Sequence, residues 1–175
     1  MTDLLLRAGT PTDAEALDTL IQAHREEGHL LARDADEIRR RASRFVVCEV
    51  DGAIVACAEL APLSKTQAEI RSLVVARDFR RAGVAARVVD EVRQRARSAG
   101  FDTLCAFTHD PRFFVRQNFS LVPHLWLPNK IAKDCVTCPL FRRCDQHAMV
   151  LPLKEIARYG INRVPAAEHR RVAVA

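Results

Sequence analysis

One segment constrains the fold of this chain more than any other: a short apolar run followed directly by arginines and a glycine. The segment is EIRSLVVARDFRRAGVA, residues 69–85. Its first part has the apolar composition of a buried strand, and residues 83–98 place apolar side chains at four-residue spacing. A strand, a basic glycine turn and an amphipathic helix therefore follow one another, with the turn at the start of the helix.

The turn from Arg80 to Ala85 has the composition of an anion-binding site. The start of a helix exposes unpaired N–H groups and behaves like about half a positive charge. Gly83 allows the backbone to approach a ligand closely, and Arg80 and Arg81 add full charges. The pattern is neither a P-loop nor a dinucleotide fingerprint. It favours a pyrophosphate site, and a tight turn with a solvated arginine pair is the alternative.

The remaining pattern predicts a mixed sheet flanked by helices, of α/β or α+β type. A helix begins after the N-cap Thr10, and Asp34 caps a second helix. The Asp51-Gly52 pair between two β-rich runs is a strong hairpin signal. Further strands are expected at 68–76, 103–108, 119–123 and 148–153, and further helices at 83–98 and 111–117.

Length and composition limit the kind of protein. With 175 residues, the chain is expected to form one domain over residues 1–175, with an irregular cysteine-rich segment at about 124–150. The apolar run at the amino terminus is too short for a signal peptide, and no stretch reaches the roughly 20 apolar residues of a membrane span. We therefore expect a cytoplasmic protein without a membrane partner. The net charge of +5 admits nucleic acid or a phosphorylated cofactor, but one Trp and one Tyr supply few stacking platforms, which disfavours nucleic acid.

Glu69 and Arg71 stand at the entrance of the apolar run and face the same side, because side chains alternate along a strand. One interpretation is a structural ion pair, which contributes little at a surface. The other is catalytic. Acyl transfer needs a neutral amine, amino groups are mostly protonated at neutral pH, and a positioned carboxylate can accept the proton. Periodicity alone does not separate the two interpretations.

The same residues carry a family resemblance. RRAGVA, which places Arg-x-x-Gly-x-Ala between an apolar strand and a long helix, resembles the acetyl-CoA signature of the GCN5-related N-acetyltransferases (GNAT). RFFVRQNF resembles that family's late short helix, and the likeness spans residues 3 to about 125. It implies the GNAT fold, a mostly antiparallel mixed sheet, with acetyl-CoA as co-substrate. Turn amides would hold the pyrophosphate, and the strand would run beside the pantetheine arm. The implied cofactor-binding positions are Leu73, Val75, Arg80, Arg81, Ala82, Gly83, Val84 and Ala85.

The chain departs from the family pattern at several positions. Arg77 stands where a proline is usual, and Arg81 and Ala85 stand where glycines are common. Asn118 replaces a glycine of the late turn, and Asn tolerates left-handed backbone angles better than most residues. Phe114 stands where many members carry a tyrosine that protonates the leaving thiolate, so the general acid is not identified.

A second resemblance concerns the acceptor. EGHLLARDADEIRRRASRFVVCEVDGAIVACAEL together with AEIRSLVV is similar to the acetyltransferase domain of N-acetylglutamate synthases, which catalyse the first step of arginine biosynthesis. LPNKIAKDCVTCPLFRRCDQHAM is similar to the carboxy-terminal segment of many short bacterial members. The likeness implies an amino-acid N-acetyltransferase with L-glutamate as acceptor and Glu69 as general base.

The same likeness implies that Arg33, Arg71 and Lys130 bind the substrate carboxylates. A dicarboxylate needs cations in its pocket, because burying an unpaired carboxylate is unfavourable. Two alternatives stay open: another small amine or amino acid as the acceptor, or a non-catalytic binding module with the same fold. A homodimer is also left open.

The carboxy-terminal segment concentrates cysteines. CVTCPLFRRCDQH offers Cys135, Cys138, Cys144 and His147, the number and types of ligand found in a structural zinc site. Packed thiols or a disulfide are the alternatives. The cysteines at 48, 57 and 105 lie within predicted strands, and we expect them to be small core residues.

Overall fold

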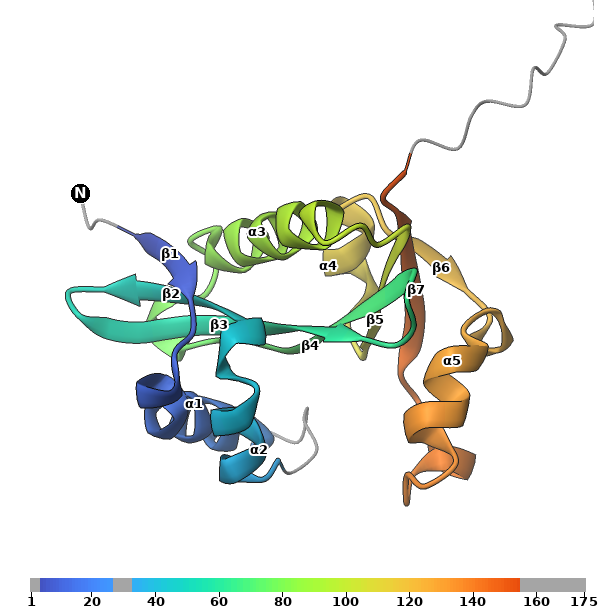
Figure 1. Cartoon of the computed structure of the whole chain (residues 1–175), viewed down its shortest axis with the longest axis horizontal. Coiled ribbons are helices and arrows are strands. Elements are labelled where there is room, and N and C mark those ends of the chain that lie inside the picture. The colour runs from blue at the N-terminus through green and yellow to red at the C-terminus, as the bar shows by residue number, and fades with distance from the viewer. Residues whose placement is uncertain (1–3, 27–32, 155–175) are drawn as a thin grey trace, which may run out of the picture.

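One seven-stranded sheet forms the centre of the protein (Figure 1). The computed structural model describes residues 4–26 and 33–154. The strand order is β1-β2-β3-β4-β5-β7-β6, and every neighbouring pair is antiparallel except β4 and β5. This confirms the predicted mixed, mostly antiparallel sheet. The strands are β1 (Leu5–Ala8), β2 (Phe45–Val50), β3 (Ala53–Pro62), β4 (Gln67–Val75), β5 (Thr103–Thr108), β6 (Ser120–Val122) and β7 (His147–Pro152).

Helices cover both faces of the sheet (Figure 1). On one face, α3 buries a stripe of four valines and an alanine against β2, β3 and β4. On the other face, α1 and α2 bury Leu17, Ile21 and Ile38 against Phe45 and Val74. The helices are α1 (Ala14–Glu26), α2 (Ala35–Arg40), α3 (Val84–Ser98), α4 (Pro111–Arg116) and α5 (Pro128–Lys130), with short turns η1 (Pro11–Asp13), η2 (Ala42–Arg44), η3 (Arg77–Phe79), η4 (His124–Trp126), η5 (Ile131–Cys135) and η6 (Phe141–Arg143).

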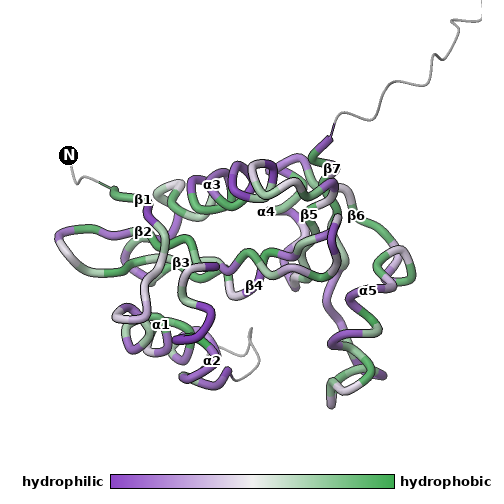
Figure 2. The backbone as a smooth tube through the Cα atoms, viewed as in Figure 1, coloured by the Kyte–Doolittle hydropathy of each residue, from purple (hydrophilic) through white to green (hydrophobic). Residues whose placement is uncertain are grey.

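Local sequence signals account for most of these elements. Asp51 and Gly52 both have positive φ, as a type I′ turn requires, so β2 and β3 form the predicted hairpin. The Asp34 side chain accepts a hydrogen bond from the Glu37 amide and caps α2. Hydropathy along α3 alternates between apolar and polar residues, with the apolar side toward the sheet (Figure 2). The amphipathic pattern therefore fixes which side of α3 packs on the sheet.

Strand β1 is not among the predicted elements. It has four residues at the edge of the sheet, and only its pairing with β2 defines it. Arg7 of this strand bonds Glu49 of β2 and Asp13 of η1, which anchors the start of the first helix. Four residues are too few for a period-two pattern to stand out in a sequence.

Two irregularities in β4 shape the centre of the sheet. Cys57 of β3 pairs with Val74, whereas Glu59 pairs with Arg71, so β4 carries one extra residue between these pairs. Ser72 lies in this bulge with φ of 48°. On its other edge, β4 pairs with β5 only from Gln67 to Ile70, although both strands continue further. The two parallel strands therefore separate beyond Ile70.

The segment from 124 to 146, predicted as part of an irregular stretch at about 124–150, carries η4, α5, η5 and η6, and the chain then returns to the sheet as β7 between β5 and β6. Leu127 is buried against Cys105 and Ala148, and Lys133 Nζ donates a hydrogen bond to the Pro62 carbonyl. These contacts hold the segment beside β5, β7 and the end of β3. Within the described ranges, none of the helices combines the length and apolar composition that crossing a membrane requires.

Candidate active site

The predicted phosphate turn lies between η3 and α3. Gly83 is the N-cap of α3 with φ of 78°, and no side chain caps the helix start. Residues 81–83 are exposed, and a Cβ placed on Gly83 would meet no heavy atom within 4 Å. The 15-residue helix therefore begins at an exposed turn, with its first amides lacking a side-chain cap.

Two departures from the family pattern are explained by backbone geometry. Arg81 has φ of 65°, a left-handed conformation that glycine adopts most easily. Asn118, in the turn after α4, also has φ of 65°, as expected for an Asn in place of glycine. Both turns therefore keep the conformation that glycine would favour.

Arg80 contributes to the architecture of the turn. Its Nε donates a hydrogen bond to the Val75 carbonyl at 3.0 Å, and its Nη2 lies 3.1 Å from His24 Nδ1. The guanidinium thus links the end of β4 and helix α1 to the turn. From the sequence, we expected the Arg80 charge to act directly on a phosphate. In the structure, the same guanidinium also holds the turn against β4 and α1.

Glu69 lies at the centre of a polar network on the α1–α2 side of the sheet. It is 3% exposed, and it pairs in register with Cys105 of β5 where the two strands are still bonded. Arg71 Nε donates to Glu69 Oε2 at 2.6 Å, and Lys130 Nζ lies 2.9 Å from the same oxygen. The structure therefore brings together three of the predicted residues, one of which is 61 residues away from Glu69 along the chain.

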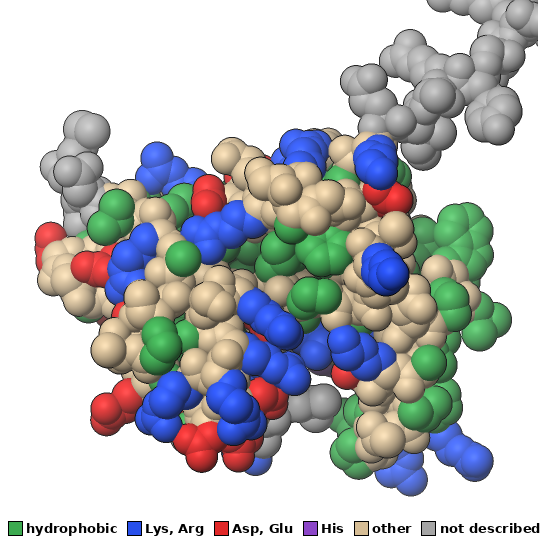
Figure 3. Space-filling view, viewed as in Figure 1, with side chains coloured by type: hydrophobic (Ala, Val, Ile, Leu, Met, Phe, Trp, Pro, Cys, Tyr) green, Lys and Arg blue, Asp and Glu red, His purple; other side chains and the backbone are tan. Residues whose placement is uncertain are grey.

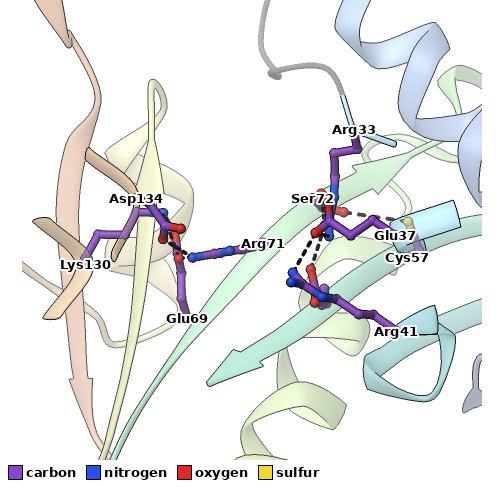
Figure 4. A network of polar contacts seen from close by, with 10 residues as sticks. Arg33, Glu37, Arg41, Cys57, Glu69, Arg71, Ser72, Lys130 and Asp134 are labelled. Atoms are coloured by element: carbon purple, nitrogen blue, oxygen red, sulfur yellow. Dashed lines mark hydrogen bonds and ion pairs between the residues drawn. The ribbon is translucent and has the colours of Figure 1, made fainter. Parts of the chain in front are cut away.

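Asp134 completes this network and was not predicted. It pairs with Arg71 Nη2, and its Oδ2 lies 3.2 Å from Lys130 Nζ. Figure 4 shows Glu69, Arg71, Lys130 and Asp134 pointing toward one another. The four-residue spacing of Lys130 and Asp134 is the one sequence signal that could have found this carboxylate.

The carboxylates of this network raise the pKa of Arg71. Burial alone would lower the pKa of Arg71, but the neighbouring carboxylates of Glu69, Asp134 and Glu59 outweigh it and raise that pKa above its usual value. Lys130 Nζ also lies 5.3 Å from the centre of the Phe107 ring, a favourable cation–π distance. Basic side chains gather around β4 in the middle of the face shown in Figure 3.

Arg33 occupies a separate position on the other side of the bulge. Its Nη1 donates to Glu59 Oε2 at 2.6 Å and to Ser72 Oγ at 3.1 Å, and its Nη2 donates to Glu37 Oε1 at 2.9 Å. Figure 4 shows this second group beside the first, with Arg33, Glu37, Arg41, Ser72 and Cys57. The predicted substrate arginine is therefore already bound by two carboxylates of the chain.

The predicted zinc ligands are Cys135, Cys138, Cys144 and His147. In the part of the chain that the structure describes, no three His, Cys, Asp or Glu side chains are placed to hold a metal ion. His147 is the first residue of β7 and lies opposite Thr108, so the sheet register fixes its position. Cys135, Cys138 and Cys144 form no disulfide, and Cys144 is exposed. The described residues therefore give no support to a zinc site, and the four zinc ligands stay a prediction.

The remaining cysteines and Phe114 are core residues. Cys48, Cys57 and Cys105 are buried free thiols, as predicted. Burial raises the pKa of Cys57 to about 12, and its thiol donates to the Ser72 carbonyl in the bulge. Phe114 is 5% exposed and packs edge-on against Phe113 and Phe119. The position of the usual tyrosine is thus filled by an apolar contact.

Comparison with known proteins matches this geometry to one family. Residues 12–119 match the acetyltransferase (GNAT) family. An uncharacterized N-acetyltransferase of Chlorobaculum tepidum is 29% identical over 151 residues, which cover 86% of this chain and 97% of that protein. An amino-acid acetyltransferase of Azotobacter vinelandii is 35% identical over 113 residues, which cover 64% of this chain and 26% of that protein. This chain therefore spans about a quarter of the length of the second relative.

Solved structures show the same fold. N-acetylglutamate synthase of Neisseria gonorrhoeae, complexed with coenzyme A and N-acetyl-glutamate, has a TM-score of 0.78 at 24% identity, covering 88% of this chain and 36% of that one. A Mycobacterium tuberculosis protein in complex with CoA has a TM-score of 0.74 at 20% identity, covering 86% of this chain and 99% of that one. Because the family match covers more than half of the chain and includes β4 and the turn at Gly83, this chain belongs to the GNAT family of N-acetyltransferases.

Proposed function

We propose that this chain transfers the acetyl group of acetyl-CoA to the α-amino group of an amino acid, with L-glutamate as the first acceptor to test. The observation that carries the proposal is the position of Glu69, a carboxylate 3% exposed on β4, close to where β4 leaves β5. The same strand leads through η3 to the open helix start at Gly83. A proton acceptor and an anion site thus lie along one continuous segment.

The cofactor would follow this segment. The diphosphate of coenzyme A would lie against the first amides of α3, where the helix dipole and Arg81 favour negative charge. The pantetheine arm would run along β4 beyond Ile70, where the strand has no β5 partner. Backbone groups there can bond an extended ligand as a neighbouring strand would. This course carries the thioester from Gly83 toward Glu69.

The acceptor would displace part of the ion network. Arg71 and Lys130 both contact Glu69 in the free chain. A substrate carboxylate that takes these donors leaves Glu69 able to accept a proton from the acceptor's ammonium group. The amine nitrogen then attacks the thioester carbon, the C–S bond breaks, and coenzyme A leaves as its thiol after protonation. Binding of the correct acceptor thereby prepares the base.

The comparisons support an amino acid as acceptor. The Azotobacter vinelandii relative is named an amino-acid acetyltransferase, and its 35% identity lies over 113 residues. The Neisseria gonorrhoeae synthase shares the fold. The Arg71–Lys130 pair, with side chains 19% and 14% exposed, supplies two partly buried cations for a carboxylate. A polyamine would meet these cations unfavourably.

Loss of the acetyl-CoA thioester absorbance, with and without L-glutamate, tests the proposal. Glu69→Gln should reduce kcat by about 10²–10⁴-fold while calorimetry shows unchanged affinity for coenzyme A. Glu15→Gln, an exposed carboxylate on α1, is the matched control and should keep full activity. If no amino acid in a panel accelerates thioester loss above water, or if Glu69→Gln keeps full turnover, the proposal is wrong.

A further inference from the structure

The proposed reaction uses Glu69, Arg71 and Lys130, and it leaves Asp134, the fourth member of their network, without a role. Asp134 lies in η5 and pairs with Arg71 Nη2, although the two residues are 63 positions apart in the chain (Figure 4). Its Oδ2 also lies 3.2 Å from Lys130 Nζ. One Asp134 oxygen therefore bridges the two cations that the proposed function assigns to an acceptor carboxylate.

The two cations divide their contacts between two carboxylates. Arg71 directs Nε to Glu69 and Nη2 to Asp134. Lys130 Nζ lies 2.9 Å from each Glu69 oxygen and also contacts Asp134. An acceptor carboxylate that bridged both cations would take the position that Asp134 holds, and at close range the two negative charges would repel each other. Exchanging one carboxylate for the other instead keeps both cations paired.

Solvent exposure indicates which carboxylate can leave. The Glu69 side chain is 4% exposed and stands on a strand that is bonded along both edges at this position. The Asp134 side chain is 31% exposed, so a rotation of this side chain is enough to bring its carboxylate into water. Partly exposed ion pairs contribute little to stability, because water solvates the separated charges well. Asp134 can therefore release both cations while Glu69 stays in place.

We propose that Asp134 is an internal competitor of the acceptor: its carboxylate occupies the position of the acceptor carboxylate on Arg71 and Lys130 until an acceptor displaces it. The inference rests on the proposed amino-acid acetylation and names the group that the acceptor replaces. An acceptor with a carboxylate can make this exchange, whereas an amine that lacks a carboxylate leaves Asp134 in place. Asp134 is then a specificity-determining residue that favours carboxylate-bearing acceptors.

Calorimetric titration of L-glutamate into the full chain saturated with coenzyme A tests the proposal, because it measures acceptor affinity without turnover. Asp134→Asn keeps the shape of the side chain and removes its charge. If the form with Asp134 released is populated at about one part in ten, the variant should bind L-glutamate about tenfold more tightly, because no internal competitor remains. With acetyl-CoA, the change should appear in KM for L-glutamate rather than in kcat.

Controls separate charge competition from other effects. The diamide of L-glutamate has the same amine and neither carboxylate, so its affinity should gain nothing from Asp134→Asn. Asp134→Glu retains a carboxylate and should keep the affinity for L-glutamate close to that of the wild type. Asp145→Asn makes the same substitution at an exposed side chain of the same segment, one that bonds His109, and should leave the affinity unchanged. Unchanged affinity for coenzyme A shows that each variant is folded.

The outcomes separate this inference from the proposed function. Weaker or unchanged binding of L-glutamate by Asp134→Asn would show that Asp134 positions the two cations instead of competing for them, and would overturn the inference while amino-acid acetylation stands. An equal gain for the diamide would also overturn it, because the effect would then not depend on a carboxylate. If neither wild type nor variant binds L-glutamate, the inference is wrong, and the acceptor panel decides separately whether amino-acid acetylation stands.

Discussion

Replacing Gly83 by alanine separates the backbone requirement of the turn from its role in binding coenzyme A. Gly83 caps α3 with φ of 78°. Gly100, just beyond the other end of the same helix, has φ of 82°, and a Cβ at either position would meet no heavy atom within 4 Å. Gly83→Ala and Gly100→Ala therefore introduce the same backbone strain in the same open surroundings. Only Gly83 lies at the proposed diphosphate site.

The magnitude follows from this geometry. A left-handed conformation disfavours an L-residue by about 1–2 kcal/mol, and the reduced freedom of the unfolded chain offsets about 0.4–1 kcal/mol. With no steric clash to add, each variant should lower the free energy of unfolding by about 1 kcal/mol. For a chain of this length that corresponds to a fall in Tm of about 2–4 °C.

Urea denaturation measures the stability, and isothermal titration calorimetry measures the affinity for coenzyme A. We expect both variants to lose similar stability, and only Gly83→Ala to bind more weakly, by about tenfold, because the new methyl group lies where the diphosphate approaches the amides. Equal affinity in the two variants would show that the turn does not hold the diphosphate. A stability loss above about 3 kcal/mol at Gly83 would contradict the open space around it.

Three further predictions concern separate parts of the chain. Lys130→Met, which removes a donor from Glu69, should raise the KM for the amino-acid acceptor about tenfold and leave affinity for coenzyme A unchanged, as steady-state kinetics and calorimetry would show. Asp13→Asn should lower the free energy of unfolding by about 1 kcal/mol at pH 7. The Arg7 hydrogen bond lowers the pKa of Asp13, so the stabilisation by the Asp13 carboxylate is present above about pH 4 and is lost as the pH falls. The unfolding curves of variant and wild type should therefore converge in acid. Because burial raises the pKa of Cys57 to about 12, iodoacetamide at pH 8 should leave this thiol unmodified in the native chain, while the cysteines of the carboxy-terminal segment react, as peptide mass analysis would reveal.

Elements defined by neighbouring residues could be predicted from the sequence. The Asp51-Gly52 turn, the Asp34 cap and the apolar stripe of α3 are local patterns, and each specifies its structure through contacts a few residues apart. The shared side of Glu69 and Arg71 also follows from strand alternation, and the 2.6 Å hydrogen bond between them confirms it. Gly28, which the sequence indicates as the end of the first helix, lies outside the described residues.

Contacts between distant segments were decided by the tertiary structure alone. The bulge at Ser72 arises only when β4 pairs with β3, and it separates Arg33 from the Glu69 network. Asp134 reaches Arg71 only because the carboxy-terminal segment folds back beside β4, and the chain that follows places His147 opposite Thr108 in the sheet. No local pattern contains these contacts.

Glu59 shows most clearly what could not be predicted from the sequence. In the sequence it is one acidic residue in an apolar run, with nothing to indicate whether it faces solvent or the interior. In the described part of the chain it is completely buried, Arg33 bonds one of its oxygens, and the other oxygen has no hydrogen-bond partner. The sequence by itself determined most of the strands, turns and helices through short-range backbone preferences and hydrophobic patterning, but not the edge strand β1. Only the tertiary structure decided which charged side chains pair with one another and which remain available to a substrate. Charge–charge interactions depend on the distance between the groups, and folding sets the distances between residues far apart in the sequence.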